Sequence, residues 1–159
     1  MKRILEILQK NARASVEEIA TMTGLSKSEV EKGIKKMEKE RVIVGYKATV
    51  NWEKAGEEFV HALVDVKVIP ERGRGYDAIA ERIYRFPEVK ALYLVSGMYD
   101  LSVLVEGRTM KDVASFVSEK LAPLEQVQGT VTHFLLKKYK ENGMIFAEVE
   151  EGKRLAISP

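Results

Sequence analysis

Apolar and polar residues alternate at helical spacing along the first forty positions of the chain. Residues 2–10 predict a first helix, because apolar side chains recur at i, i+3 and i+4 spacing: Ile4, Leu5, Ile7 and Leu8. Two further helices are each announced by a Ser-x-x-Glu capping box, at Ser15–Glu18 and at Ser26–Glu29. Gly24 lies between them and can adopt a positive φ without steric cost. The pattern therefore predicts a helix-turn-helix.

The second helix of this pair has two distinct faces when its residues are placed at about 100° per residue. Its core face is apolar: Val30, Ile34 and Met37. The opposite stripe holds only serine and lysine: Ser28, Lys32, Lys35 and Lys39. Such a stripe suits DNA phosphates and a major groove. The alternative is a solvated helix whose lysines face outward by chance.

Six residues of this helix are the predicted DNA contacts: Ser26, Lys27, Ser28, Lys32, Lys35 and Lys36. The start of the helix offers free backbone N–H groups and the positive end of the helix dipole to a phosphate. Ser28 and Lys32 are placed to reach base edges, where lysine suits guanine O6 and N7.

After Glu40 the pattern changes to short β-branched runs. Residues 42–44 and 46–50 predict a strand, which completes a winged helix-turn-helix domain over residues 1–50. The polar stretch 51–58 predicts a linker. Trp52 within it is interpreted as an anchor packed against a domain rather than as a platform that stacks on bases.

Residues 59–138 predict a second domain with the order β-α-β-β-α-β, the ferredoxin-like unit, so that the fold class is α+β. Residues 60–69 alternate as a half-buried strand does, and Gly97-Met98 has the form of a two-residue hairpin. The other predicted elements are helices over residues 76–86 and 109–121 and strands over residues 89–96, 99–105 and 130–136.

Residues 139–159 predict a C-terminal extension. Asn142-Gly143 is a turn sequence, and Met144–Val149 and Arg154–Ile157 have the composition of two short strands. The pattern leaves open whether they pair with their own sheet or with a partner chain.

Composition narrows the class of protein. The chain has no Cys, which removes disulfides and thiolate chemistry, and no apolar run long enough to span a membrane. The N-terminus lacks a signal-peptide core, so we expect a cytoplasmic protein. Residues 1–47 hold 11 Lys/Arg and 7 Asp/Glu, whereas the remainder holds 15 and 17. The basic excess therefore lies in the half that contains the helix-turn-helix.

Three stretches in the right order carry a family resemblance. They are IATMTGLSKSEVEKGIKKMEKERVIVGYKATV, the strand VDVKVIP and the hairpin SGMYDLSVLVEG. Together they resemble the leucine-responsive regulatory protein/asparagine-synthase regulator family (Lrp/AsnC, or feast/famine), over about residues 2–137. The resemblance implies a transcriptional regulator that binds double-stranded DNA and forms a homodimer, or multiples such as a tetramer or octamer, through the C-terminal domain. It also implies a small-molecule effector, frequently an amino acid.

The resemblance implies that the effector binds between dimers near the hairpin. The candidate residues there are Gly97, Met98, Tyr99, Asp100 and Thr132. Asp100 could accept hydrogen bonds from an α-amino group, and hairpin N–H groups could meet a carboxylate. The alternative is structural: Gly97 for the turn, Tyr99 for packing, and Asp100 for tying the hairpin's own N–H groups.

The sequence departs from the family pattern at Gly33, where an arginine is common. Glycine inside a helix costs about 1 kcal/mol relative to alanine. Either something packs closely against Gly33, or the DNA contact has moved to Lys32, Lys35 and Lys36.

Arg72 and Arg74 lie in a glycine-containing loop before a predicted helix and suggest an anion site. A flexible turn with solvated arginines is the favoured alternative. The spacing matches neither a P-loop nor a dinucleotide fingerprint, so no cofactor is expected.

The two histidines, His61 and His133, are predicted to be sheet residues rather than metal ligands. No nucleophile or acid–base pair supports an enzyme. The leading hypothesis is a sequence-specific DNA-binding regulator tuned by a small ligand. The alternatives are a small-molecule-binding module whose winged helix contacts proteins, and a DNA-compacting oligomer without specific operator control.

Overall fold

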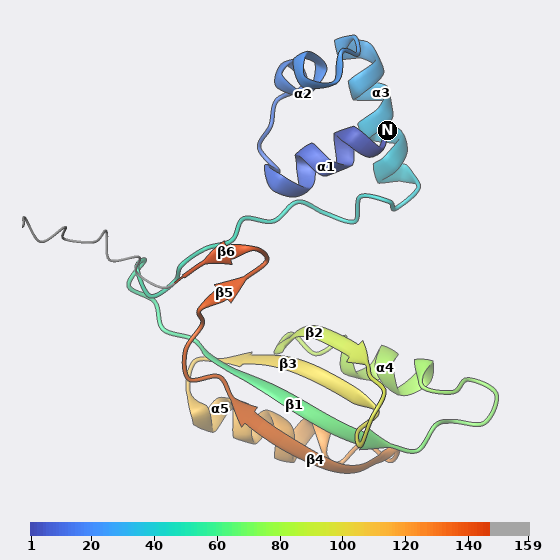
Figure 1. Ribbon diagram of the computed structural model, residues 1–159. Coiled ribbons are helices and arrows are strands. Elements are labelled where there is room, and N and C mark those ends of the chain that lie inside the picture. The colour runs from blue at the N-terminus through green and yellow to red at the C-terminus, as the bar shows by residue number, and fades with distance from the viewer. Residues whose placement is uncertain (147–159) are drawn as a thin grey trace, which may run out of the picture. The chain divides into compact units, whose positions relative to one another are not determined.

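The computed structural model describes residues 1–146, and these form two compact units. The first unit comprises Met1–Val50, and the second begins at Asn51 (Figure 1). No helix of the described residues is long and apolar enough to cross a membrane.

The first unit contains the three predicted helices: α1 (Lys2–Lys10), α2 (Val16–Thr23) and α3 (Lys27–Lys39). Both capping boxes form, and Gly24 ends α2 at φ 74°, as predicted. The helices enclose a small apolar core, in which the side chains with the least exposure are Ile4, Ile19, Val30 and Met37.

The strand predicted over residues 42–50 is wrong for this chain. Arg41 turns the chain with φ 56°, and the N–H groups of Val42 and Ile43 both donate to the carbonyl of Met37. This places Ile43 against the helical core, while Val44 is 80% exposed. The following residues pair with no strand in residues 1–146, so the β-branched composition lacks the ladder that a strand needs.

The second unit has the predicted β-α-β-β-α-β order (Figure 1). Its strands are β1 (Val60–Val68), β2 (Val89–Leu94), β3 (Leu101–Gly107) and β4 (Val127–Phe134). They form an antiparallel sheet in the order β2-β3-β1-β4. The helices are α4 (Asp77–Ile83) and α5 (Met110–Phe116), and α5 continues as a π-helical turn, η1 (Val117–Leu121).

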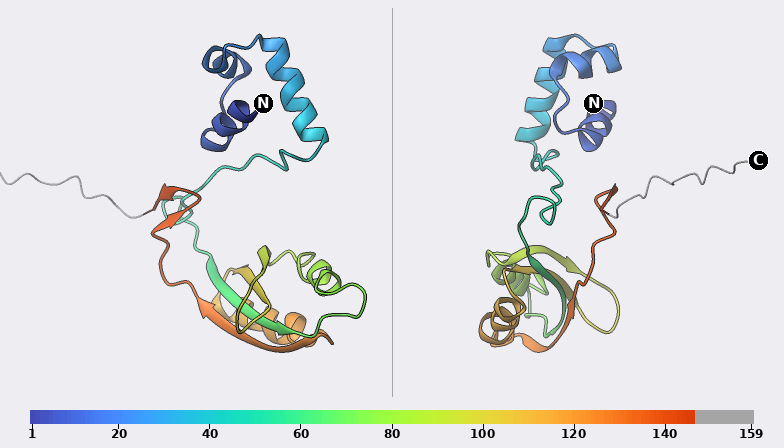
Figure 2. Two further views of the ribbon diagram at one scale, coloured as in Figure 1. Left: turned by 45° about the vertical axis from the view of Figure 1, so that its right-hand side comes forward. Right: turned by 90° about the vertical axis from the view of Figure 1, so that its left-hand side faces the viewer.

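One face of this sheet carries the core of the unit. Alternate residues of β1 are buried against side chains of α4, α5 and η1: Ala62, Val64, Val66 and Val68. Both helices lie on this side of the sheet (Figure 2). No helix of residues 51–146 covers the other face, where Leu63 and Leu104 are cross-strand partners.

The hairpin between β2 and β3 is wider than the two residues predicted. The Val95 N–H donates to the Asp100 carbonyl at 2.9 Å, so four residues form the loop. The Asp100 N–H donates to Val66 on β1 at 3.1 Å. The Asp100 backbone is hydrogen-bonded to β1, and β3 begins at the next residue. The loop therefore comprises residues 96–99 rather than the two residues Gly97-Met98. Gly97 in this loop has φ 142°, outside the range that other residues prefer.

The polar stretch predicted as a linker is folded onto the second unit. The Trp52 ring packs edge-on against Phe59, with 5.6 Å between ring centroids. The Arg108 guanidinium lies 4.4 Å from the centroid of Phe59 and pairs with Glu57. Trp52 therefore acts as the anchor that the sequence predicted.

The beginning of the C-terminal extension forms a small hairpin. Strands β5 (Lys140–Glu141) and β6 (Met144–Ile145) pair with each other across Asn142-Gly143. The strand predicted over residues 144–149 is described as far as residue 146. Its strand part, β6, covers only Met144–Ile145 and pairs within the extension. The strand predicted at Arg154–Ile157 lies outside the described residues.

Candidate DNA-binding helix and effector hairpin

Helix α3 presents the predicted lysine stripe to solvent. Its inner face buries Val30, Gly33 and Met37, and Ile34 is half-buried. Every residue of the opposite stripe is exposed: Ser28, Lys32, Lys35 and Lys39. The two capping boxes fix where α2 and α3 begin, and packing of Val30 and Met37 into the core turns the lysine stripe outward.

Close packing explains the glycine at position 33. A Cβ atom there would lie 3.0 Å from Met1 Cε, 3.1 Å from Met1 Sδ and 3.5 Å from Ile4 Cδ1. A larger side chain at position 33 would therefore need the Met1 side chain to move. Position 33 faces the core of this unit and is not a surface for DNA.

The six predicted DNA contacts are not equivalent in their charges. Lys27 Nζ lies 2.8 Å from Glu17 Oε1, and Lys36 Nζ lies 3.8 Å from Glu40 Oε1. Lys32 and Lys35, by contrast, form no ion pair with any residue in 1–146. These two lysines can therefore meet a phosphate or a base without first breaking an intramolecular pair.

The start of α3 is already occupied by its own cap. Ser26 Oγ donates to Glu29 Oε2 at 2.6 Å, and its backbone N–H donates to the same carboxylate oxygen at 2.8 Å. The Ser26 hydroxyl and N–H together hold the pKa of Glu29 below its usual range. Ser26 therefore serves the helix cap, and the Glu29 carboxylate weakens the attraction of this helix end for phosphate.

The hairpin predicted to bind an effector is largely open to solvent. Gly97 is exposed, Met98 is 81% exposed, and Tyr99 is half-buried. These residues belong to the loop between β2 and β3. The two strands hold the ends of the loop, and its tip is exposed to solvent.

Asp100 ties this loop to β1. Its Oδ2 accepts the Val68 N–H at 3.0 Å, the Lys67 ammonium lies 3.1 Å away, and the Tyr76 hydroxyl donates to Oδ1 at 3.4 Å. The Val68 N–H holds the pKa of Asp100 below its usual range despite partial burial, and Lys67 and Tyr76 add to the effect. The carboxylate thus has a structural role, and an effector amine would compete with these donors.

Thr132 is not brought to the other four predicted effector residues within one chain. It lies on β4 and pairs with Val64, so β1 separates it from the hairpin strands. It also shares the helix-covered face with Val64.

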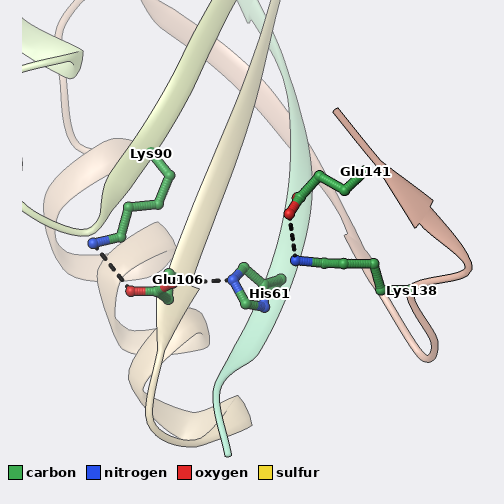
Figure 3. Close-up of polar contacts among 5 residues, drawn as sticks. All are labelled: His61, Lys90, Glu106, Lys138 and Glu141. Carbon is green, nitrogen blue, oxygen red and sulfur yellow. Dashed lines mark hydrogen bonds and ion pairs between the residues drawn. The ribbon is translucent and has the colours of Figure 1, made fainter. Parts of the chain in front are cut away.

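The two histidines are sheet residues, as predicted. His61 Nε2 lies 3.0 Å from Glu106 Oε2, and Lys90 Nζ lies 3.0 Å from Glu106 Oε1 (Figure 3). Burial raises the pKa of Glu106, but Lys90 and His61 more than offset it and hold this pKa below its usual range. His133 Nε2 lies 3.4 Å from Asp65 Oδ2. Among the described residues, no group of three or more His, Asp or Glu side chains is placed to hold a metal ion.

Comparisons with known proteins agree with both halves of this arrangement. Residues 2–38 match the AsnC-type helix-turn-helix domain, and residues 61–145 match the Lrp/AsnC ligand binding domain. The chain is 54% identical over 157 residues to an uncharacterized HTH-type transcriptional regulator of Bacillus subtilis, YugG, covering 98% of this chain and 95% of the relative.

Two solved structures share the fold. A feast or famine regulatory protein of Mycobacterium tuberculosis complexed with L-methionine is similar at a TM-score of 0.72 and 25% identity, over 88% of this chain and 92% of that one. A transcriptional regulator of Neisseria meningitidis complexed with L-methionine is similar at a TM-score of 0.71 and 24% identity, over 87% and 89%.

A helix-turn-helix unit joined to an α+β ligand-binding unit defines a class of transcriptional regulators. Within that class, this chain belongs to the Lrp/AsnC family.

Because the Asp100 carboxylate stabilises the fold, Asp100→Asn should be less stable than wild type. The size of this difference should depend on pH. Because the folded-state pKa is lowered, the stabilisation is complete above the unfolded-state pKa of about 3.9 and is lost as pH falls through the folded value. The variant should therefore unfold at lower urea concentration than wild type at neutral pH, and the difference should shrink as pH falls below the unfolded-state pKa of about 3.9. Glu58→Gln, at an exposed carboxylate, should show no such difference. A constant difference at every pH would contradict this role.

Proposed function

We propose that the protein binds specific operator DNA through α3, with Lys32 and Lys35 as the principal side-chain contacts. One observation carries this proposal. On the outer face of a doubly capped helix-turn-helix, these two lysines are exposed and make no ion pair with residues 1–146. Ser28 lies on the same stripe and adds a hydroxyl contact to the DNA. The backbone N–H groups of Lys27 and Ser28 donate to a phosphate at the start of the helix. Lys36 and Lys27 contribute after release from their glutamates, and Ser26 acts through the cap.

Replacing both free lysines tests the DNA surface directly. Lys32→Ala/Lys35→Ala should weaken binding to the DNA upstream of the protein's own gene, measured at several salt concentrations. If both lysines contact phosphates, the slope of log K against log salt should fall in magnitude by about two for each bound subunit, and so by about four for a dimer.

The matched control is Lys54→Ala/Lys111→Ala, which removes the same charge from the second unit. It should leave the affinity and the slope close to wild type. Equal losses in the two double variants would show that net charge, rather than α3, governs binding. Binding that ignores DNA sequence at every salt concentration would favour a DNA-compacting protein over an operator-specific regulator.

The uncovered face of the sheet supports a homodimer. Leu63, Leu104 and Val131 lie on this face, and Val131 remains 37% exposed. An apolar patch on a sheet with no covering layer is an expected site of association. A dimer would present two α3 helices to half-sites about one helical turn, or a multiple, apart. Tetramers or octamers would add further half-sites.

Leu104→Glu should convert the dimer to a monomer in sedimentation experiments, because a carboxylate would have to be buried without a partner in the interface. Met110→Glu is the control, since Met110 is 56% exposed at the start of α5 on the helix-covered side. Circular dichroism would show that both variants are folded. A Leu104→Glu variant that remains dimeric would exclude this face as the interface.

We further propose that a small molecule, such as an amino acid, binds at the loop between β2 and β3. The exposed loop tip at Gly97 and Met98, followed by the half-buried Tyr99, supports this proposal, as do the L-methionine complexes of two proteins with this fold. Since Asp100 is occupied by Val68, Lys67 and Tyr76, loop N–H groups and the Met98 and Tyr99 side chains are the better candidates for contact. Thr132 could take part only if assembly brings it from another subunit.

A thermal-unfolding screen of L-amino acids tests this effector site. A ligand at about a hundred times its Kd stabilises a protein by about 2.7 kcal/mol, so an effector should raise Tm clearly. Tyr99→Ala should lose the rise, whereas Tyr139→Ala, at an exposed tyrosine just before β5, should keep it. An unchanged rise in Tyr99→Ala would place the effector elsewhere.

A further inference from the structure

The loop between β1 and α4 is a closed turn rather than a loose connection. The N–H of Glu71 donates to the Gly75 carbonyl at 2.9 Å, and the N–H of Gly75 donates back to the Glu71 carbonyl at 2.7 Å. Gly73 and Gly75 have φ values of 87° and 58°, which other residues rarely adopt. This turn brings Arg74 back to α4, where its Nη2 donates to Glu81 Oε2 at 3.0 Å.

Helix α4 adds two more arginines to the same place. Ile79 and Ile83 are buried against the sheet, which turns Arg82 outward, and Arg85 follows just after the helix end. Between the turn and the helix lies a pocket of about 290 Å³. Its charged and polar lining consists of Glu71, Arg74, Glu81, Arg82, Arg85 and Gln126.

The positive charge of this pocket is only partly neutralised. Three arginines face two glutamates, and the Arg74–Glu81 pair cancels one charge of each sign. Arg82 Nη1 donates to the neutral Gln126 Oε1 at 3.2 Å, and Arg85 forms no ion pair with residues 1–146. Two guanidinium groups therefore keep charge and hydrogen-bond donors available, beside the Glu71 carboxylate, which forms no ion pair within residues 1–146.

We propose that this pocket binds a small organic anion through a phosphate or carboxylate group held by Arg82 and Arg85. Guanidinium groups present forked donors that match such oxyanions. The Glu71 carboxylate can accept a hydrogen bond from an amine or hydroxyl of the same molecule. None of the residues Gly97–Asp100 lines the pocket, so this site is separate from the hairpin and does not depend on the proposed effector there.

A small ligand fits this pocket better than a DNA backbone does. Duplex DNA presents a continuous row of phosphates and is bound by extended basic surfaces. Here Glu71 and Glu81 lie among the arginines and would repel neighbouring phosphates. A concave pocket of about 290 Å³ instead matches a small molecule that carries one anionic group.

Calorimetric titration of the full chain with pyrophosphate, and separately with L-glutamate, tests the proposal. Wild type should bind at least one of the two probes, and Arg82→Gln/Arg85→Gln should bind it about tenfold or more weakly, because two charge-assisted contacts are lost. The control Lys111→Gln/Lys137→Gln removes the same charge elsewhere and should bind as wild type does. Preference for pyrophosphate would indicate a phosphorylated ligand, and preference for glutamate a carboxylate.

Amide chemical-shift mapping on the wild-type protein provides a second measurement that needs no variant. The probe should shift the amides of residues 71–77 and of α4 more than those of the loop between β2 and β3. Three results would overturn the proposal: no binding of either probe at millimolar concentration, equal losses in both double variants, or shifts confined to other regions. If the arginine variant instead loses only operator affinity, these arginines contact DNA.

Discussion

The pairing of β1 with a strand on each side is the constraint on which the second unit depends. Its alternate residues, Ala62, Val64, Val66 and Val68, are buried against the helices, and the intervening residues face the other way. A shift of one residue in register would exchange the two faces completely. This single alternation therefore positions the apolar core, the uncovered face with Leu63, and the end of β1 that holds Asp100.

The first unit depends on caps and close packing instead. The capping boxes fix where α2 and α3 begin, and α3 turns Val30, Gly33 and Met37 towards a small apolar core. Glu17 of α2 and Glu40 at the end of α3 pair with Lys27 and Lys36, whereas Lys32 and Lys35 form no ion pair within residues 1–146. Charge pairing therefore separates Lys32 and Lys35 from Lys27 and Lys36. The positions of these lysines around the helix could not make this distinction.

Asp100 shows how a family signature can serve the fold. The Gly-x-Tyr-Asp pattern marks the hairpin, yet the aspartate accepts hydrogen bonds from Val68 and Tyr76 and pairs with Lys67. The loop tip is thereby held at both ends while Met98 is left in solvent. A rigid base beneath an exposed tip is a suitable frame for a ligand-binding loop.

The sequence by itself determined the elements whose signals are local. The helix boundaries at Lys2, Ser15 and Ser26, the left-handed Gly24 and the β-α-β-β-α-β order all follow from caps and periodicity along a short stretch. Only the tertiary structure decided that residues 42–50 pair with no strand in residues 1–146, that the hairpin is wide, and that Arg74, Arg82 and Arg85 line one pocket. Strand pairing, the contact of Asp100 with β1 and the closing of the pocket by Gln126 join segments distant in the chain, and local periodicity carries no information about such contacts.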